Sequence, residues 1–209
     1  MNVHVKGHLR RWEAALLIGT ALFLIAGALA LGTQDALAEK VVRLHVLANS
    51  DSEEDQALKL KVRDTVLDRA EALLAQAGDR EEAEALLRGR LLEFEELAEA
   101  VVAQAGYDYP VRVELEDTAF PTKEYDGFQL PAGEYLALRV LIGEAAGQNW
   151  WCVVYPPLCT AAAAEVPAAA LQAGLSRDQV GLITEENAGY VLKFKAVEWW
   201  EHLRARLVG

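Results

Sequence analysis

Cys152, Cys159 and His45 are the residues whose types could support nucleophilic catalysis. A cysteine-dependent hydrolase would use one thiolate as the nucleophile and a neighbouring histidine as the base. Nothing in the spacing places His45 near either cysteine. The adjacent Trp150 and Trp151 indicate that Cys152 is buried, and a buried cysteine is commonly a small core residue. The sequence therefore predicts no catalytic residue and no enzyme, with a cysteine-dependent envelope hydrolase as the alternative.

The two cysteines could instead pair with each other. Six residues separate Cys152 from Cys159, and they include Pro156 and Pro157. An extended segment of this length would hold the two Cα atoms roughly 20 Å apart, whereas a disulfide needs them within about 7 Å. The two prolines would have to turn the segment back on itself. A disulfide and two free thiols both remain open at this point.

Neither a metal nor a cofactor is predicted. After residue 38 the chain has two histidines, His45 and His202, and no pair of histidines or cysteines at a zinc-binding spacing. The acidic residues in 51–55 lack the central glycine and the alternating ligands of a calcium loop. They stand where a helix is expected to begin, and acidic side chains there interact well with the positive end of the helix dipole.

Composition excludes several further classes of protein. The 209 residues include 32 acidic and 20 basic side chains, which gives a formal charge of -12. Nucleic-acid binding needs clustered Lys and Arg, so an acidic chain of this kind is not a nucleic-acid binder. None of the three serines lies in a Gly-x-Ser-x-Gly sequence, which argues against a hydrolase with a nucleophile elbow.

Residues 1–38 have the three parts of a secretory signal. A basic head ends at Arg11, an uncharged run of 18 residues covers 14–31, and a small-x-small sequence ends at Ala38. About 18 apolar residues can also span a bilayer, so the segment is a signal peptide or a membrane anchor. The sequence predicts export, cleavage after Ala38, and a single exported domain over 39–209.

Hydrophobic periodicity predicts the elements of the exported part. Alternation predicts strands over residues 40–48, 111–116, 136–142 and 190–197, and a run that is apolar on both faces predicts another over 150–155. Helical spacing predicts two long helices, one after the capping residues 50–54 and ending at Gly78, the other over 79–106. Weaker patterns predict helical turns over 176–183 and a terminal helix over 199–207.

These elements predict an α+β fold, in which a mostly antiparallel sheet carries two long helices on one face. Such a sheet can leave its second face in water. The basic side chains expected there are Arg43, His45, Arg112, Arg139, Lys193 and Lys195. This face could dock an acidic partner or an anionic membrane. The alternative is a solvated face whose basic side chains pair with Glu114 and its neighbours.

Asp126-Gly127 lies between two short arms that carry aromatic residues and predicts a β-hairpin with an exposed tip. Aromatic residues on shaped loops often anchor interfaces, although they are more often part of a core. The predicted partner contacts, from the basic face and the hairpin together, are Arg43, His45, Arg139, Tyr125 and Phe128.

Three segments together resemble the stage II sporulation protein R family of endospore-forming bacteria. The first is Arg43-Leu-His-Val-Leu-Ala-Asn-Ser-Asp-Ser52 with the following Asp55-Gln56 and Lys59-Leu-Lys-Val-Arg-Asp64. The second is Phe120-Pro-Thr-Lys123 with Pro131-Ala-Gly-Glu-Tyr135. The third is Gly147-Gln-Asn-Trp-Trp-Cys-Val153 with Pro156-Pro-Leu-Cys159. Each motif alone is weak, and the three in order over about 40–160 are specific.

The resemblance implies a secreted developmental signal. Such a protein is made in the forespore, is exported into the space between the forespore and mother-cell membranes, and activates a membrane-embedded aspartic protease of the mother cell. That protease processes the precursor of sigma-E. The role requires no catalytic residue in this chain, and the family offers no active site to transfer. A scaffold protein of the septal envelope is a further alternative.

Overall fold

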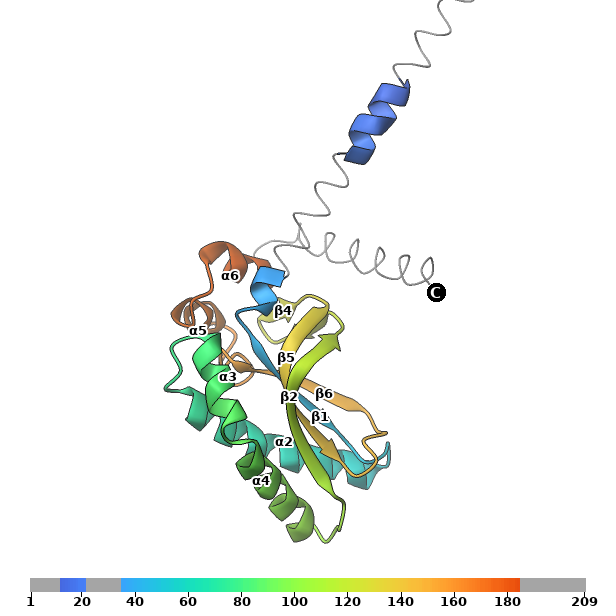
Figure 1. Ribbon diagram of the computed structural model, residues 1–209, viewed down its shortest axis with the longest axis vertical. Coiled ribbons are helices and arrows are strands. Elements are labelled where there is room, and N and C mark those ends of the chain that lie inside the picture. Colours follow the sequence, from blue (N-terminus) through green and yellow to red (C-terminus); the bar gives the residue numbers. More distant parts are fainter. Residues whose placement is uncertain (1–11, 22–34, 185–209) are drawn as a thin grey trace, which may run out of the picture.

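The computed structural model describes residues 12–21 and 35–184, and Figure 1 shows their arrangement. The strand predicted over 190–197 and the helix predicted over 199–207 lie outside these residues. Residues 12–21 are helical. Within the two described ranges, no helix combines the length and the apolar character needed to cross a membrane.

A four-stranded sheet forms the centre of the domain. Its strands lie in the order β2 (Val111–Phe120), β5 (Gly133–Ile142), β1 (Val42–Leu47) and β6 (Asn149–Tyr155). β5 is antiparallel to β2 and β6 is antiparallel to β1, but the central strands β1 and β5 are parallel. The α+β class agrees with the sequence, whereas the sheet is mixed. A parallel pair needs a long crossover, and three helices, β2 and a short hairpin lie between β1 and β5 in the chain.

Three helices cover one face of the sheet where two were predicted. They are α2 (Glu53–Leu74), α3 (Arg80–Arg88) and α4 (Leu91–Gln104). The helix predicted over 79–106 is interrupted at Gly89, a residue with poor helix propensity that forms the C-cap of α3. Asp79 caps α3 by accepting from the Glu82 backbone N–H, as the sequence predicts.

Apolar side chains from the four strands of the sheet and the three helices form the first core. The central members Leu44, Val46, Val62, Phe94 and Ala98 are almost completely buried. Alternation along β1 sends Val42, Leu44 and Val46 to this core and the intervening residues to the opposite face.

The opposite face of the sheet is covered, which corrects the prediction of a solvated face. A hairpin of β3 (Lys123–Tyr125) and β4 (Phe128–Leu130) contributes to a second core together with α5 (Val166–Gln172) and α6 (Arg177–Ile183). Figure 1 shows α5, α6 and β4 gathered at one end of the sheet. The two helices of this cover lie in the Ala-rich stretch after Cys159, where the sequence pattern is weak.

The loop after β1 is tied to the turn between β5 and β6. The Asn49 side chain accepts from the Glu144 backbone N–H at 3.0 Å, and the Asp51 carboxylate accepts from that of Gln148 at 2.7 Å. The buried Lys59 donates from Nζ to the Gln148 carbonyl at 2.9 Å. Residues of the first and third motifs therefore meet in one polar corner.

Candidate partner-contact site

Arg43, the second residue of β1, lies inside a box of aromatic rings. Its side chain is fully buried, and its guanidinium carbon lies 4.0 Å from the centroid of the Phe120 ring and 4.9 Å from that of Tyr135. Arg43 Nη2 donates to the Tyr125 hydroxyl at 2.5 Å. Cation–π contacts of this kind favour a desolvated guanidinium. Burial nevertheless lowers the pKa of Arg43 below its ordinary value, because it disfavours the charged form.

His45 follows on the same face of β1 and is 7% exposed. Its Nε2 forms a 2.7 Å hydrogen bond with the Asn149 side-chain oxygen, and its ring lies 5.8 Å from that of Phe120. Burial is the main cause that lowers the pKa of His45, and the hydrogen bond to Asn149 opposes it. The charges of Arg139 and Arg43 lower this pKa further.

The predicted exposure of Arg43 and His45 is wrong. The sequence placed both on a wet sheet face, but the hairpin and the aromatic residues of β2 and β5 close over them. In this arrangement neither side chain offers a broad contact surface to a partner.

Arg139 lies opposite His45 in the parallel pairing of β1 with β5. Its guanidinium contacts the Glu114 carboxylate at 3.3 Å and also bonds to Glu116. The alternative in which basic residues pair with Glu114 and its neighbours is therefore confirmed for Arg139. Arg112, on the same strand as these acids, is exposed.

The predicted hairpin at Asp126-Gly127 is present, but its tip is not free. Phe128 is 2% exposed, and its ring stacks on that of the half-buried Tyr125 with centroids 4.6 Å apart. Gly127 adopts a φ of +80°, and a Cβ there would lie 2.5 Å from the Cβ of Ala163. The tip therefore packs against the segment that leads to α5.

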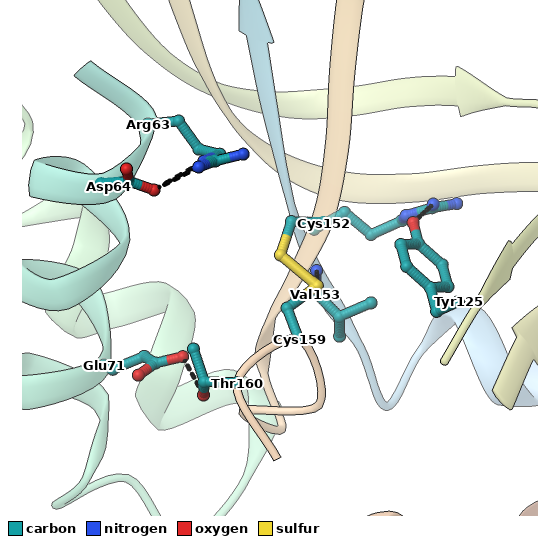
Figure 2. Close-up of a disulfide and its surroundings, with 9 residues drawn as sticks. Arg63, Asp64, Glu71, Tyr125, Cys152, Val153, Cys159 and Thr160 are labelled. Carbon is teal, nitrogen blue, oxygen red and sulfur yellow. Dashed lines mark hydrogen bonds and ion pairs between the residues drawn. A yellow bond between two sulfur atoms is a disulfide. The ribbon is translucent and has the colours of Figure 1, made fainter. Parts of the chain in front are cut away.

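Cys152 and Cys159 form a disulfide, with their Cα atoms 6.0 Å apart (Figure 2). The Pro156-Pro157 turn brings the two cysteines together, which decides between the alternatives that the sequence left open. Beside the bridge, the Thr160 hydroxyl donates to the Glu71 carboxylate of α2 at 2.6 Å (Figure 2). A sulfur held in a disulfide is not the thiolate that the hydrolase alternative requires.

Sequence reasoning missed the residues that enclose Arg43 and His45, namely Phe120, Tyr135 and Asn149. The concentration of aromatic residues between 120 and 151 was the available signal, but it does not tell which rings face the basic side chains.

A cleft of about 730 Å³ near the disulfide, with Glu71, Tyr155 and Glu165 in its lining, was also not predicted. Within residues 12–21 and 35–184, no group of His, Cys, Asp and Glu could hold a metal ion.

The site and its neighbourhood lie inside the part of the chain that matches known proteins. The family model described as Stage II sporulation protein R matches residues 38–165. This chain belongs to the stage II sporulation protein R family. Membership of this family connects the chain with sporulation.

A relative within the family confirms the match over a similar length. The chain is 38% identical over 121 residues to Stage II sporulation protein R of Bacillus subtilis (strain 168). The match covers 58% of this chain and 54% of that relative, so it spans about half the length of the relative. No solved structure matches the chain.

Proposed function

We propose that this chain is a secreted sporulation signal that activates the mother-cell membrane aspartic protease responsible for processing the sigma-E precursor. The observation that carries the proposal is the family match over 38–165, which contains all three motifs. Within the proposal, the protein acts in the space between the forespore and mother-cell membranes. It acts through binding, and it contributes no residue to the protease's chemistry.

Two features of the chain support an exported protein. The basic head, the apolar run over 14–31 and the Ala36-Leu37-Ala38 sequence are the parts of an export signal. Disulfides persist mainly in oxidising compartments, and Cys152 and Cys159 are paired.

Reconstitution in a non-sporulating host tests the proposal. The full chain is produced together with the candidate protease and the sigma-E precursor, and precursor cleavage is followed by immunoblot. Cleavage should require this chain and should be lost when Leu17 and Leu24 in the apolar run are replaced by Arg, because charged residues there block export. Cleavage that proceeds equally well without this chain would refute the proposal.

Cysteine substitutions separate a signal from a hydrolase in the same assay. Cys152→Ser and Cys159→Ser, singly and together, should leave precursor cleavage intact wherever the protein accumulates to normal levels. A hydrolase would lose activity with one particular cysteine even when the protein remains folded and exported. A septal scaffold would instead associate stably with membrane complexes in cells that lack the protease.

A further inference from the structure

Arg43 is a fully buried cation without an anionic partner in the described part of the chain. Its Nε and Nη1 atoms are buried and form no hydrogen bond with residues of 12–21 or 35–184. None of the ion pairs in these ranges includes Arg43. Buried charges are normally paired, and unsatisfied buried donors are costly, so this arrangement requires a functional or structural explanation.

Among the described residues, the guanidinium has one hydrogen-bond partner, the Tyr125 hydroxyl, and this partner is neutral. Burial raises the pKa of Tyr125 above its ordinary value, and the opposing effect of the Arg43 charge is smaller. The hydroxyl is therefore protonated at pH 7, and it fills a single donor position at Nη2. The rings of Phe120 and Tyr135 contact the guanidinium, whereas Nε and Nη1 at its edge have no hydrogen-bond partner within 12–21 and 35–184.

The free edge has the chemistry of a carboxylate site. A carboxylate that bonds twice to a guanidinium uses either the Nη1–Nη2 pair or the Nε–Nη2 pair. Both pairs include Nη2, which carries one N–H for each pair, and the Tyr125 hydroxyl accepts from Nη2. Because this hydroxyl belongs to the hairpin that covers the fully buried guanidinium, it has to move before a carboxylate can reach either pair. The other atom of each pair is one of the unpartnered donors.

The element that carries Tyr125 can be displaced without opening the sheet. β3 and β4 pair with each other and with none of the four strands of the main sheet. Lys123 and Glu124 are exposed and Tyr125 is half-buried, so the hairpin separates Arg43 from solvent. Movement of the hairpin has an energetic cost, because Phe128 and Leu130 are buried beneath it. A partner that supplies a carboxylate would offset this cost.

We propose that Arg43 is a concealed binding site for an acidic side chain of a partner protein, which displaces the Tyr125 hydroxyl and binds the guanidinium through two hydrogen bonds. The inference rests on the proposed function for the identity of the partner. The chemistry of the site does not depend on that identity, because any accessible Asp or Glu side chain on an extended segment would fit it.

Arginine side-chain NMR tests the inference directly. The full chain, labelled with ¹⁵N-arginine and purified in a mild detergent, is titrated with a blocked peptide that has one glutamate flanked by alanines. A blocked peptide with glutamine in its place is the control, and a third peptide has its C-terminus as the sole carboxylate. Arg139 is an internal reference, because Glu114 and Glu116 already bind it.

The glutamate peptide should shift the Nε–H resonance of Arg43 and leave that of Arg139 in place, and the glutamine peptide should shift neither. Tyr125→Phe removes the competing hydroxyl and should tighten binding about threefold to tenfold, in line with the loss of one hydrogen bond. Arg43→Lys, if it folds, assigns the Arg43 Nε–H resonance through its disappearance from the spectrum. If Arg43→Lys does not fold, the titration of Tyr125→Phe still tests the inference.

Equal responses to the glutamate and glutamine peptides, in both the unaltered chain and Tyr125→Phe, would overturn the inference and leave Arg43 as a structural cation in an aromatic box. Binding of the C-terminal carboxylate alone would overturn the assignment to a side chain. Neither result would affect precursor cleavage in the reconstituted host. Conversely, failure of that reconstitution with a positive titration would refute the proposed protease partner and not the carboxylate site.

Discussion

Arg43 and Arg139 carry the same charge on adjacent strands, yet the surroundings of the two side chains predict different responses to charge reversal. Arg43→Glu places a carboxylate among buried rings and should lower the free energy of unfolding by more than about 3 kcal/mol. Arg139→Glu alters a partly exposed ion pair and should cost about 1 kcal/mol. Urea unfolding of both variants checks this difference, and similar values for the two would contradict the burial of Arg43.

The depressed pKa of His45 predicts a pH-dependent stability. The unfolded chain has the ordinary pKa near 6.5, so below that pH it binds a proton that the folded chain excludes. Stability should therefore fall as the pH drops below about 6.5, by at most about 1.4 kcal/mol per pH unit from this group. His45→Gln should flatten the profile between pH 5 and 7 and leave the slope near pH 8 unchanged. Parallel profiles for the two proteins would show that His45 titrates normally.

At the scale of the elements, the corner between the β1 loop and the β5–β6 turn has no space for additional atoms. A Cβ at Gly147 would lie 2.2 Å from the Ser50 carbonyl oxygen, which is a backbone atom and cannot rotate away. Gly147→Ala should therefore lower the free energy of unfolding by about 2–3 kcal/mol.

Gly78→Ala is the matched control for this prediction. A Cβ at Gly78 would make an ordinary 3.4 Å contact with the flexible Glu82 side chain, so the change should stay within about 0.5 kcal/mol. Thermal and urea unfolding of both variants measure the difference. If both substitutions were tolerated equally, the close approach of the two loops would be wrong.

At the scale of the whole molecule, residues 35–38 connect the N-terminal segment with the second core. Leu37 is 1% exposed, and the Gln179 side chain of α6 donates to the Ala36 carbonyl at 3.0 Å. Leu37→Ala in the full chain should therefore lower the free energy of unfolding by about 2–4 kcal/mol. Leu171→Ala, at a site that is 44% exposed, should cost less than about 1 kcal/mol.

The burial of Leu37 links the predicted processing site to the stability of the domain. Cleavage after Ala38 would leave a chain that begins at Glu39 and lacks Leu37. Intact-mass measurement of exported protein identifies the first residue. A mature chain that begins at Glu39 lacks the buried Leu37 side chain. Its free energy of unfolding should therefore be lower than that of the unprocessed chain. A membrane-bound species that retains Met1 would contradict cleavage, though not export.

Much of the local structure could be predicted from the sequence. Strands β1, β5 and β6, the Asp126-Gly127 hairpin and the Asp79 cap follow from alternation, turn chemistry and capping, which act between residues close in the chain. The family could be recognised for a related reason, since its motifs are short and ordered. The break at Gly89 was missed, because a single glycine is often tolerated within a helical pattern.

The tertiary structure alone decided what covers each face of the sheet. Alternation along β1 determines that Arg43 and Leu44 point in opposite directions, but it contains no information about what lies above either side chain. The parallel pairing of β1 with β5 depends on contacts between residues about ninety positions apart. The cover of the second face comes from two short helices with weak patterns and from a hairpin whose turn is predicted but whose packing partners are not. Their packing buries Arg43, which the sequence places on an exposed docking surface. This burial depends on residues far apart in the chain, so a local sequence pattern cannot predict it.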